Sequence, residues 1–94
     1  PAYFFYIMEA LIEAGYAAGL KEDVARKLVL KTALGSAKLL EILKEDPAIL
    51  RSKVTSKGGT TEAAIKVFES KKFKNIIKDA VKAARARSKE LQKR

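Results

Sequence analysis

Residues 2–20 read AYFFYIMEALIEAGYAAGL, and this stretch decides the fold. It holds 15 hydrophobic residues and only two charged ones, Glu9 and Glu13. The apolar side chains go most of the way round a helix, whereas a surface helix carries them on one side. A chain of 94 residues can hardly surround such a helix by itself, so a partner chain is the natural source of cover. The stretch therefore predicts a homodimer.

A membrane-spanning helix is the rival interpretation of residues 2–20, because about 20 apolar residues can cross a bilayer. Glu9 and Glu13 lie one turn apart near its middle, and each would cost about 2.5–3.5 kcal/mol there. The sequence favours a helix buried on more than one side, so we expect no membrane partner.

The remaining sequence continues in helical patterns with few breaks, since it has only two Pro and five Gly in all. Gly19 is placed to end the first helix as a left-handed cap. Apolar residues then recur at helical spacing from about residue 22 to Lys44. Gly35 lies inside this second helix, where a Gly costs about 0.8–1.0 kcal/mol against Ala. That cost predicts another backbone close to Gly35, most simply at a helix crossing.

Asp46 and Pro47 mark a third helix start, with Asp46 as N-cap, and this short helix is expected over about residues 47–54. Thr60 or Thr61 is expected to cap a fourth helix that ends near residues 70–72. A fifth is expected from about Phe73 to the terminus. The sequence thus predicts an all-α fold of about five helices in an intertwined homodimeric bundle, with residues 1–94 as one domain.

Composition excludes several kinds of chemistry. The chain has no Cys and no His, so it lacks a thiol nucleophile, an imidazole base and the usual zinc ligands. It contains no GxGxxG or P-loop pattern, and hence no nucleotide fingerprint. No catalytic residue, metal or cofactor is predicted in this chain. The absence of Cys and of a visible signal peptide leads us to expect a cytoplasmic protein. Because the chain opens with Pro1, we expect it to be cut from something longer.

The net charge of +9 is concentrated in one segment. Residues 71–94 carry ten Lys and Arg against two acidic residues, whereas residues 1–70 carry ten against nine. Six of the basic residues recur at spacings of three and four, on one face of the last helix: Lys74, Lys78, Lys82, Arg85, Lys89 and Lys93. They form either a solvated outer face or a surface for nucleic acid or an acidic partner. The first is favoured, because no aromatic residue follows Phe73.

Two carboxylate pairs, Glu9 with Glu13 and Glu41 with Glu45, lie one helical turn apart. General acid–base chemistry would need one of these carboxylates in a cleft with a perturbed pKa, and the sequence shows no such setting. A polar seam in a helix interface explains Glu9 and Glu13 equally well.

The segment from Ser56 to Thr61 reads SKGGTT and is the one stretch without periodicity. Its two glycines permit backbone conformations that a side chain forbids and leave the peptide N–H groups accessible. The helix start that follows offers unpaired N–H donors and a partial positive charge, which suit an anion. An ordinary Gly-rich turn with a Thr N-cap is the other interpretation, and spacing alone favours it.

Four separated blocks of the chain resemble pyrroline-5-carboxylate reductase. They are EALIEAG…AGL in the first helix, ARKLVLKTALGSAKLL at 25–40, DPAILRSKVTSKGGTTEAAIKVFE at 46–69 and AVKAARARSKEL at 80–91. The resemblance covers Pro1 to about Leu91 and matches the C-terminal helical domain of that family. It implies a homodimer interlocked through the first two helices, with larger rings of dimers as a further step.

The resemblance also implies an activity and a site. The family reduces pyrroline-5-carboxylate to proline with NADP(H) or NAD(H), which a separate Rossmann domain binds. Its Ser-Pro-Gly-Gly-Thr-Thr loop holds the substrate carboxylate. The matching positions here imply a substrate-binding set of Ser56, Gly58, Gly59, Thr60 and Thr61, with Val54 as an apolar residue near the ring. Thr61 matches the threonine that also reaches the ring nitrogen.

The chain departs from the family in two respects. Lys57 stands where the family usually has Pro, which frees the backbone before the glycines and adds a charge. The Rossmann domain is absent from these residues, so we expect no reductase activity from them alone. A basic helical module, or an engineered dimer scaffold, that binds nucleic acid or an acidic partner through the last helix is the alternative.

Overall fold

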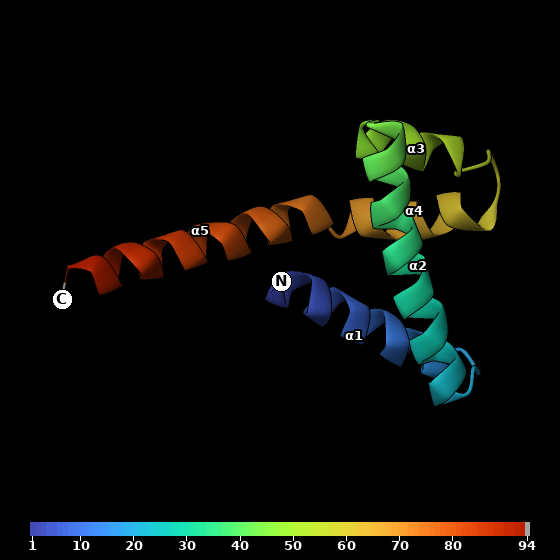
Figure 1. Cartoon of the computed structure of the whole chain (residues 1–94), viewed down its shortest axis with the longest axis horizontal. Helices are drawn as coiled ribbons and strands as arrows, with labels where there is room; N and C mark the ends of the chain where they lie inside the picture. Colours follow the sequence, from blue (N-terminus) through green and yellow to red (C-terminus); the bar gives the residue numbers. More distant parts are fainter. Residues whose placement is uncertain (94) are drawn as a thin grey trace. The chain divides into compact units, whose positions relative to one another are not determined.

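The computed structural model describes residues 1–93. These residues form five helices and no strand: α1 (Ala2–Ala17), α2 (Glu22–Leu43), α3 (Pro47–Lys53), α4 (Thr60–Ser70) and α5 (Phe73–Gln92) (Figure 1). The prediction of an all-α fold with about five helices is confirmed. Two compact units divide the chain, Pro1–Leu50 and Arg51–Arg94, and each is described by itself. That residues 1–94 act as one domain stays a prediction.

Local sequence signals account for the helix ends. The C-cap of α1 is Ala18, with φ of −82°, so the prediction of Gly19 as the cap itself is one residue too late. Gly19 follows with φ of +110°, in the region that side chains disfavour. α2 begins at Glu22, so two acidic side chains lie in its first turn at the positive end of the helix dipole. Asp46 caps α3, because its Oδ1 accepts the Ala48 N–H at 2.8 Å.

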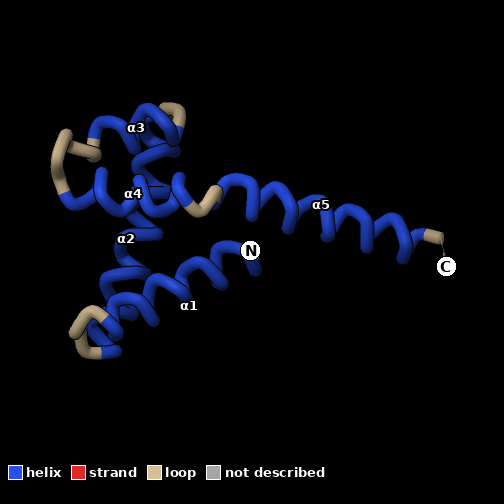
Figure 2. Tube along the Cα trace, turned by 180° about the vertical axis from the view of Figure 1, so that it is seen from behind, coloured by secondary structure: helices blue, strands red, loops and turns tan. Residues whose placement is uncertain are grey.

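In the first unit, α1 packs against α2 close to the turn that joins them. A Cβ atom at Gly15 would lie 3.2 Å from the Cβ atom of Ala25 and 3.5 Å from Leu20 Cδ1. Ala25 is 1% exposed, and no other residue among 1–93 is buried. From this contact the two helices diverge (Figures 1 and 2). The core of the unit is therefore confined to one small crossing.

The apolar side chains of α1 remain largely open to solvent in the single chain. Phe4 and Tyr6 are each 74% exposed, and Phe5 is 66% exposed. This exposure agrees with the prediction that one copy cannot bury the helix. With 16 residues in α1, none of the helices described for residues 1–93 combines the length and apolar character needed to cross a membrane.

The predicted close backbone at Gly35 is wrong for the single chain. A Cβ atom on Gly35 would meet nothing within 4 Å among the described residues. The reason is the position of the crossing, since α1 meets α2 at Ala25 and Gly35 lies about 15 Å farther along the helix axis. The conformational cost of Gly35 therefore has no compensating contact within residues 1–93.

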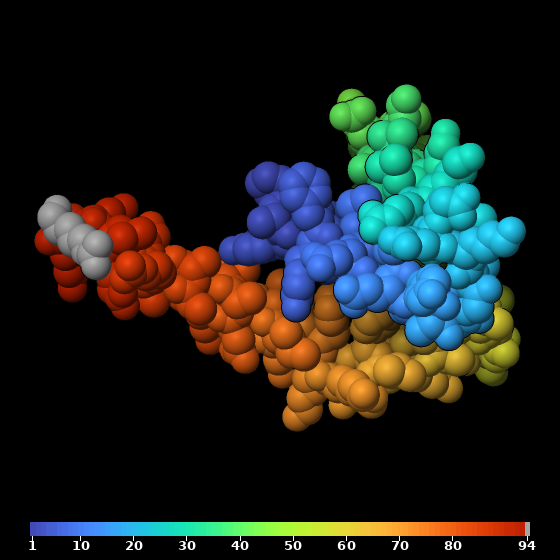
Figure 3. Space-filling model, turned by 90° about the horizontal axis from the view of Figure 1, so that it is seen from below, coloured from blue at the N-terminus to red at the C-terminus, as the bar shows by residue number. Residues whose placement is uncertain are grey.

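In the second unit, α5 continues from α4 and does not fold back on it (Figures 1 and 3). The junction is Lys71 followed by Lys72, whose φ of 55° is left-handed. The rings of Phe68 and Phe73 face each other across it, with centroids 5.2 Å apart and a tilt of 58°. This aromatic contact links α4 to the start of α5. Farther along α5 the apolar side chains are exposed to solvent, as at Ile76, which is 56% exposed.

Candidate functional site

The segment before α4 is a β-turn that its two glycines make possible. The Gly59 N–H donates to the Ser56 carbonyl oxygen at 3.0 Å, and Gly58, the third residue of the turn, has φ of +75°. A positive φ at that position is the mark of a type II turn, which favours Gly there and Pro one residue earlier. Lys57 occupies that earlier position. Turn geometry therefore accounts for Gly58, and it would also suit a proline at position 57.

The φ of Gly59 is −87°, which any residue can adopt, so backbone conformation does not require a glycine there. The requirement is steric. A Cβ atom built on Gly59 would lie 2.5 Å from Ser56 Oγ and 3.2 Å from the Ser56 carbonyl oxygen. The side chain of Ser56 therefore folds over the backbone of Gly59 in space that only glycine leaves free. This contact places the Ser56 hydroxyl directly beside the first turn of α4.

The first turn of α4 presents its donors without a side-chain cap. The helix begins at Thr60 with Gly59 as N-cap, so the prediction that Thr60 or Thr61 is the N-cap is wrong. The chain becomes helical one residue earlier than predicted because the turn already ends at Gly59. The first α4 backbone bond runs from Ala63 N–H to Gly59 O at 3.3 Å, and the N–H groups of Thr60 and Thr61 precede it.

The same segment carries three hydroxyl groups. Within residues 1–93, the hydroxyls of Ser56, Thr60 and Thr61 make no hydrogen bond to another protein group. The structure thus brings five of the six predicted site residues into one short turn and helix start. The sixth, Val54, lies just after α3 and is 69% exposed.

Sequence reasoning missed Glu62, which also belongs to this segment. Its Oε1 accepts the Gly58 N–H at 3.1 Å and lies 3.6 Å from Lys66 Nζ. Since the Gly59 N–H is used by Ser56 O, both glycine N–H groups are engaged inside the chain. The glycines therefore shape the loop, and the N–H groups of Thr60, Thr61 and Glu62 remain as free donors in the first turn of α4. An acidic residue three positions after an N-cap is the available sequence signal, as in a capping box.

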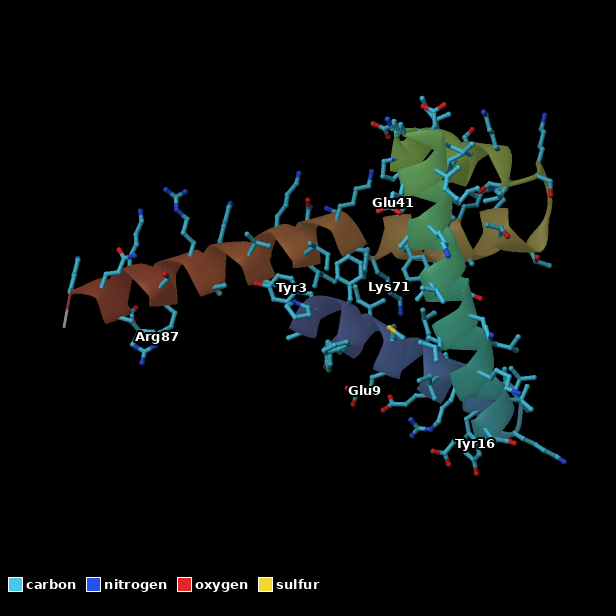
Figure 4. The ribbon with its side chains drawn as sticks, viewed as in Figure 1. Tyr3, Glu9, Tyr16, Glu41, Lys71 and Arg87 are labelled. Atoms are coloured by element: carbon cyan, nitrogen blue, oxygen red, sulfur yellow. The ribbon has the colours of Figure 1, made fainter. Side chains whose placement is uncertain are left out.

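Glu9 and Glu13, one of the two predicted carboxylate pairs, lie in a different setting. A groove of about 600 Å³ between α1 and the start of α2 is lined by Phe5, Met8, Glu9, Ile12, Glu13, Tyr16, Glu22 and Arg26. Arg26 there pairs with Glu22 at 2.9 Å. Figure 4 shows Glu9 and Tyr16 on the first unit. No group of three or more metal-ligating side chains occurs among the described residues. The groove is an apolar surface with an acidic border.

Basic side chains extend from one side of α5. Figure 4 shows nitrogen-tipped side chains along one side of the helix, while Arg87 leaves from the opposite side. Arg87 pairs with Glu90 at 2.8 Å. The six residues of the predicted stripe make no ion pair within residues 1–93. The apolar and basic sides of α5 are therefore distinct.

Comparison with known proteins gives one consistent result. The family model for pyrroline-5-carboxylate reductase dimerisation matches residues 1–91. Pyrroline-5-carboxylate reductase of Pseudomonas aeruginosa is 47% identical over 91 residues, which cover 97% of this chain and 33% of the relative. The Synechocystis enzyme of that name is 47% identical over 94 residues, covering 100% of this chain and 35% of the relative.

Solved structures agree with the sequence relatives. A Coxiella burnetii pyrroline-5-carboxylate reductase superposes with a TM-score of 0.92 at 46% identity, over 97% of this chain and 34% of that one. A Plasmodium falciparum pyrroline carboxylate reductase with NADP bound superposes with a TM-score of 0.86 at 33% identity, over 89% of this chain and 34% of that one. The chain spans about a third of the length of these relatives. It belongs to the pyrroline-5-carboxylate reductase dimerisation family, as its sequence blocks predicted.

Proposed function

We propose that this chain is the homodimerisation and carboxylate-binding part of a pyrroline-5-carboxylate reductase, an NAD(P)H-dependent enzyme of proline biosynthesis. The observation that carries the proposal is uncovered apolar surface. Within the first unit, Phe4 and Tyr6 of α1 are each 74% exposed and Phe5 is 66% exposed, so one copy leaves the aromatic surface of this helix without cover. Obligate homodimers bury roughly 2,000–5,000 Å² or more, mostly apolar. A second copy supplies cover of this kind for α1 and α2, and the name of the matching family supports the same role.

The carboxylate-binding role rests on the start of α4. A carboxylate beside Thr60 and Thr61 would receive their backbone N–H groups and hydroxyls, together with the hydroxyl of Ser56. The positive end of the helix dipole favours an anion there. Gly58 and Gly59 hold the turn that leaves these donors open. The exposed Val54 supplies an apolar surface before the turn for the ring of a proline-like ligand.

Reduction itself needs groups outside these residues. Residues 1–93 contain no strand and the sequence no GxGxxG pattern, so they do not fit a Rossmann dinucleotide site. We expect this chain alone to show no NADPH oxidation with pyrroline-5-carboxylate, followed by absorbance. Turnover above the enzyme-free background would contradict that expectation.

The assembly state tests the first half of the proposal. Sedimentation at micromolar concentration is expected to give about twice the 10.4 kDa chain mass. The unfolding midpoint is expected to rise with protein concentration, because dissociation accompanies unfolding. A monomer at all concentrations, with a constant midpoint, would contradict it. Larger rings of dimers would appear in the same measurement as higher masses.

Ligand binding tests the second half. Titration with L-proline is expected to shift the amide NMR signals of Thr60 and Thr61, while that of Gly19, in the other unit, stays in place. Thr61→Val keeps the shape of the side chain and removes its hydroxyl, so it is expected to weaken binding about three- to tenfold. Absence of any shift at the two threonines at saturating proline would overturn the carboxylate-binding role.

The basic stripe of α5 makes no ion pair within residues 1–93 and favours a second candidate, a module that binds nucleic acid or an acidic partner. Binding to duplex DNA that weakens steeply with salt would support it. We expect such binding to be weak, because the stripe has no aromatic or base-reading residues among its charges.

A further inference from the structure

A carboxylate already lies at the loop that we propose binds one. Glu62 Oε1 accepts the Gly58 N–H at 3.1 Å, so the side chain turns back past the helix start toward the β-turn. Glu62 is the third residue of α4 and therefore lies in the same first turn as Thr60 and Thr61. The free donors of the loop and the anionic side chain thus share one turn of helix.

Side-chain cations compensate the negative charge of Glu62 only weakly. Its nearest cation is Lys66 Nζ at 3.6 Å, and the Lys66 side chain is 75% exposed, whereas that of Glu62 is 33% exposed. An exposed lysine at this distance is strongly solvated and contributes little screening of a partly covered carboxylate. A second carboxylate arriving beside the threonines would meet a like charge carried by the same first turn of α4.

We propose that Glu62 is an internal competitor that lowers the affinity of the Ser56–Thr61 loop for carboxylate ligands. The inference rests on the proposed carboxylate-binding function of the loop. Glu62 acts in two ways: its charge repels the incoming anion, and its oxygen takes the Gly58 N–H that the anion would otherwise share. The loop is thereby kept in its turn conformation without ligand and discriminates against weakly held anions.

Glu62→Gln separates charge from hydrogen bonding, because glutamine keeps an oxygen acceptor for the Gly58 N–H and has no charge. The probe is cyclopentanecarboxylate, a ring carboxylate without the ring nitrogen, titrated at low salt and followed by the Thr60 and Thr61 amide signals. Like charges a few ångströms apart near a protein surface predict about three- to tenfold tighter binding to the variant. The difference is expected to shrink at high salt.

Glu69→Gln is the matched control, since it removes the same charge from the same helix seven residues, or about 10 Å, farther along. Its affinity is expected to stay within about twofold of the native chain. Cyclopentanecarboxamide, the uncharged counterpart of the probe, is expected to show no gain with Glu62→Gln. A residue with only a structural role would not produce this charge-selective gain.

The outcomes separate the two proposals. Equal or weaker binding of cyclopentanecarboxylate by Glu62→Gln, with the threonine signals still shifting, would overturn the role of Glu62 and leave the carboxylate site standing. No shift at Thr60 or Thr61 in either protein, with L-proline or with the probe, would overturn the carboxylate site and the competitor role together.

Discussion

Gly15 of α1 approaches Ala25 of α2 so closely that a Cβ atom on the glycine would lie 3.2 Å from that of the alanine. Ala25 is the only buried residue among 1–93, so this pair marks the whole packed core of the first unit. Two small residues permit the approach, and neither carries the bulk of a usual core side chain. The fold of a single copy therefore rests on close backbone contact and little buried area.

Gly15→Val tests this crossing. The added methyl groups must push against Ala25 or Leu20 Cδ1, which is 3.5 Å from the Cβ position, so α1 and α2 have to separate. Overpacking of this kind costs typically 1–3 kcal/mol of unfolding free energy, which urea denaturation measures. Ala86→Val, which adds bulk at an exposed site on α5, is the control and is expected to change stability by less than about 0.5 kcal/mol. Equal effects would count against the crossing.

The sequence was sufficient to predict the helices because their ends carry local signals. Asp46 before Pro47 and Gly19 after α1 act through their immediate neighbours, so no knowledge of packing was needed. Gly35 shows the opposite case. Its presence inside a helix indicates that something compensates its cost, but the partner at a crossing is not encoded locally, and no partner lies within the described chain.

Lys57→Pro is expected to stabilise the protein by about 0.4–1 kcal/mol. Lys57 is the second residue of a turn with a positive φ at Gly58, and Pro is favoured at that position because its fixed φ fits. The Lys57 N–H donates no hydrogen bond among residues 1–93, so none is lost. Urea denaturation measures the gain, with Lys53→Pro, inside α3, as a control expected to destabilise. A loss of stability with Lys57→Pro would contradict the assigned turn.

Gly58→Ala is expected to destabilise the chain by about 1–2 kcal/mol, because φ of +75° brings a Cβ atom too close to the backbone. No atom of residues 1–93 lies within 4 Å of that Cβ position, so backbone strain alone accounts for the effect. Gly58→Asn is the control, since asparagine tolerates this conformation better and is expected to recover part of the loss. Equal stability of Gly58→Ala and the native chain in urea denaturation would show that the turn can take another form.

At the candidate site the sequence predicted the residues more fully than their roles. Five of the predicted residues come together in one β-turn and helix start because they are close in sequence: Ser56, Gly58, Gly59, Thr60 and Thr61. The role of each residue depends on which backbone N–H groups already donate hydrogen bonds within the chain. Glu62 takes one of these groups through a side chain whose direction the spacing alone does not give. A capping pattern in the sequence indicates such a contact only when the N-cap is already known.

Phe4→Glu tests whether a second copy covers α1. Phe4 is 74% exposed in the single chain, so its replacement removes almost no contact within one copy and is expected to leave the helical CD spectrum of a monomer unchanged. In a dimer that covers this face, the same change places a charge in an apolar interface. Loss of a central aromatic contact costs about 2–4 kcal/mol, so the dimer dissociation constant is expected to rise at least about thirtyfold. Sedimentation over a range of concentrations measures this dissociation constant.

Gln92→Glu, which introduces the same side chain near the end of α5, is the control and is expected to dissociate like the native chain. Unchanged dimerisation of Phe4→Glu would show that the second copy covers another part of the apolar surface.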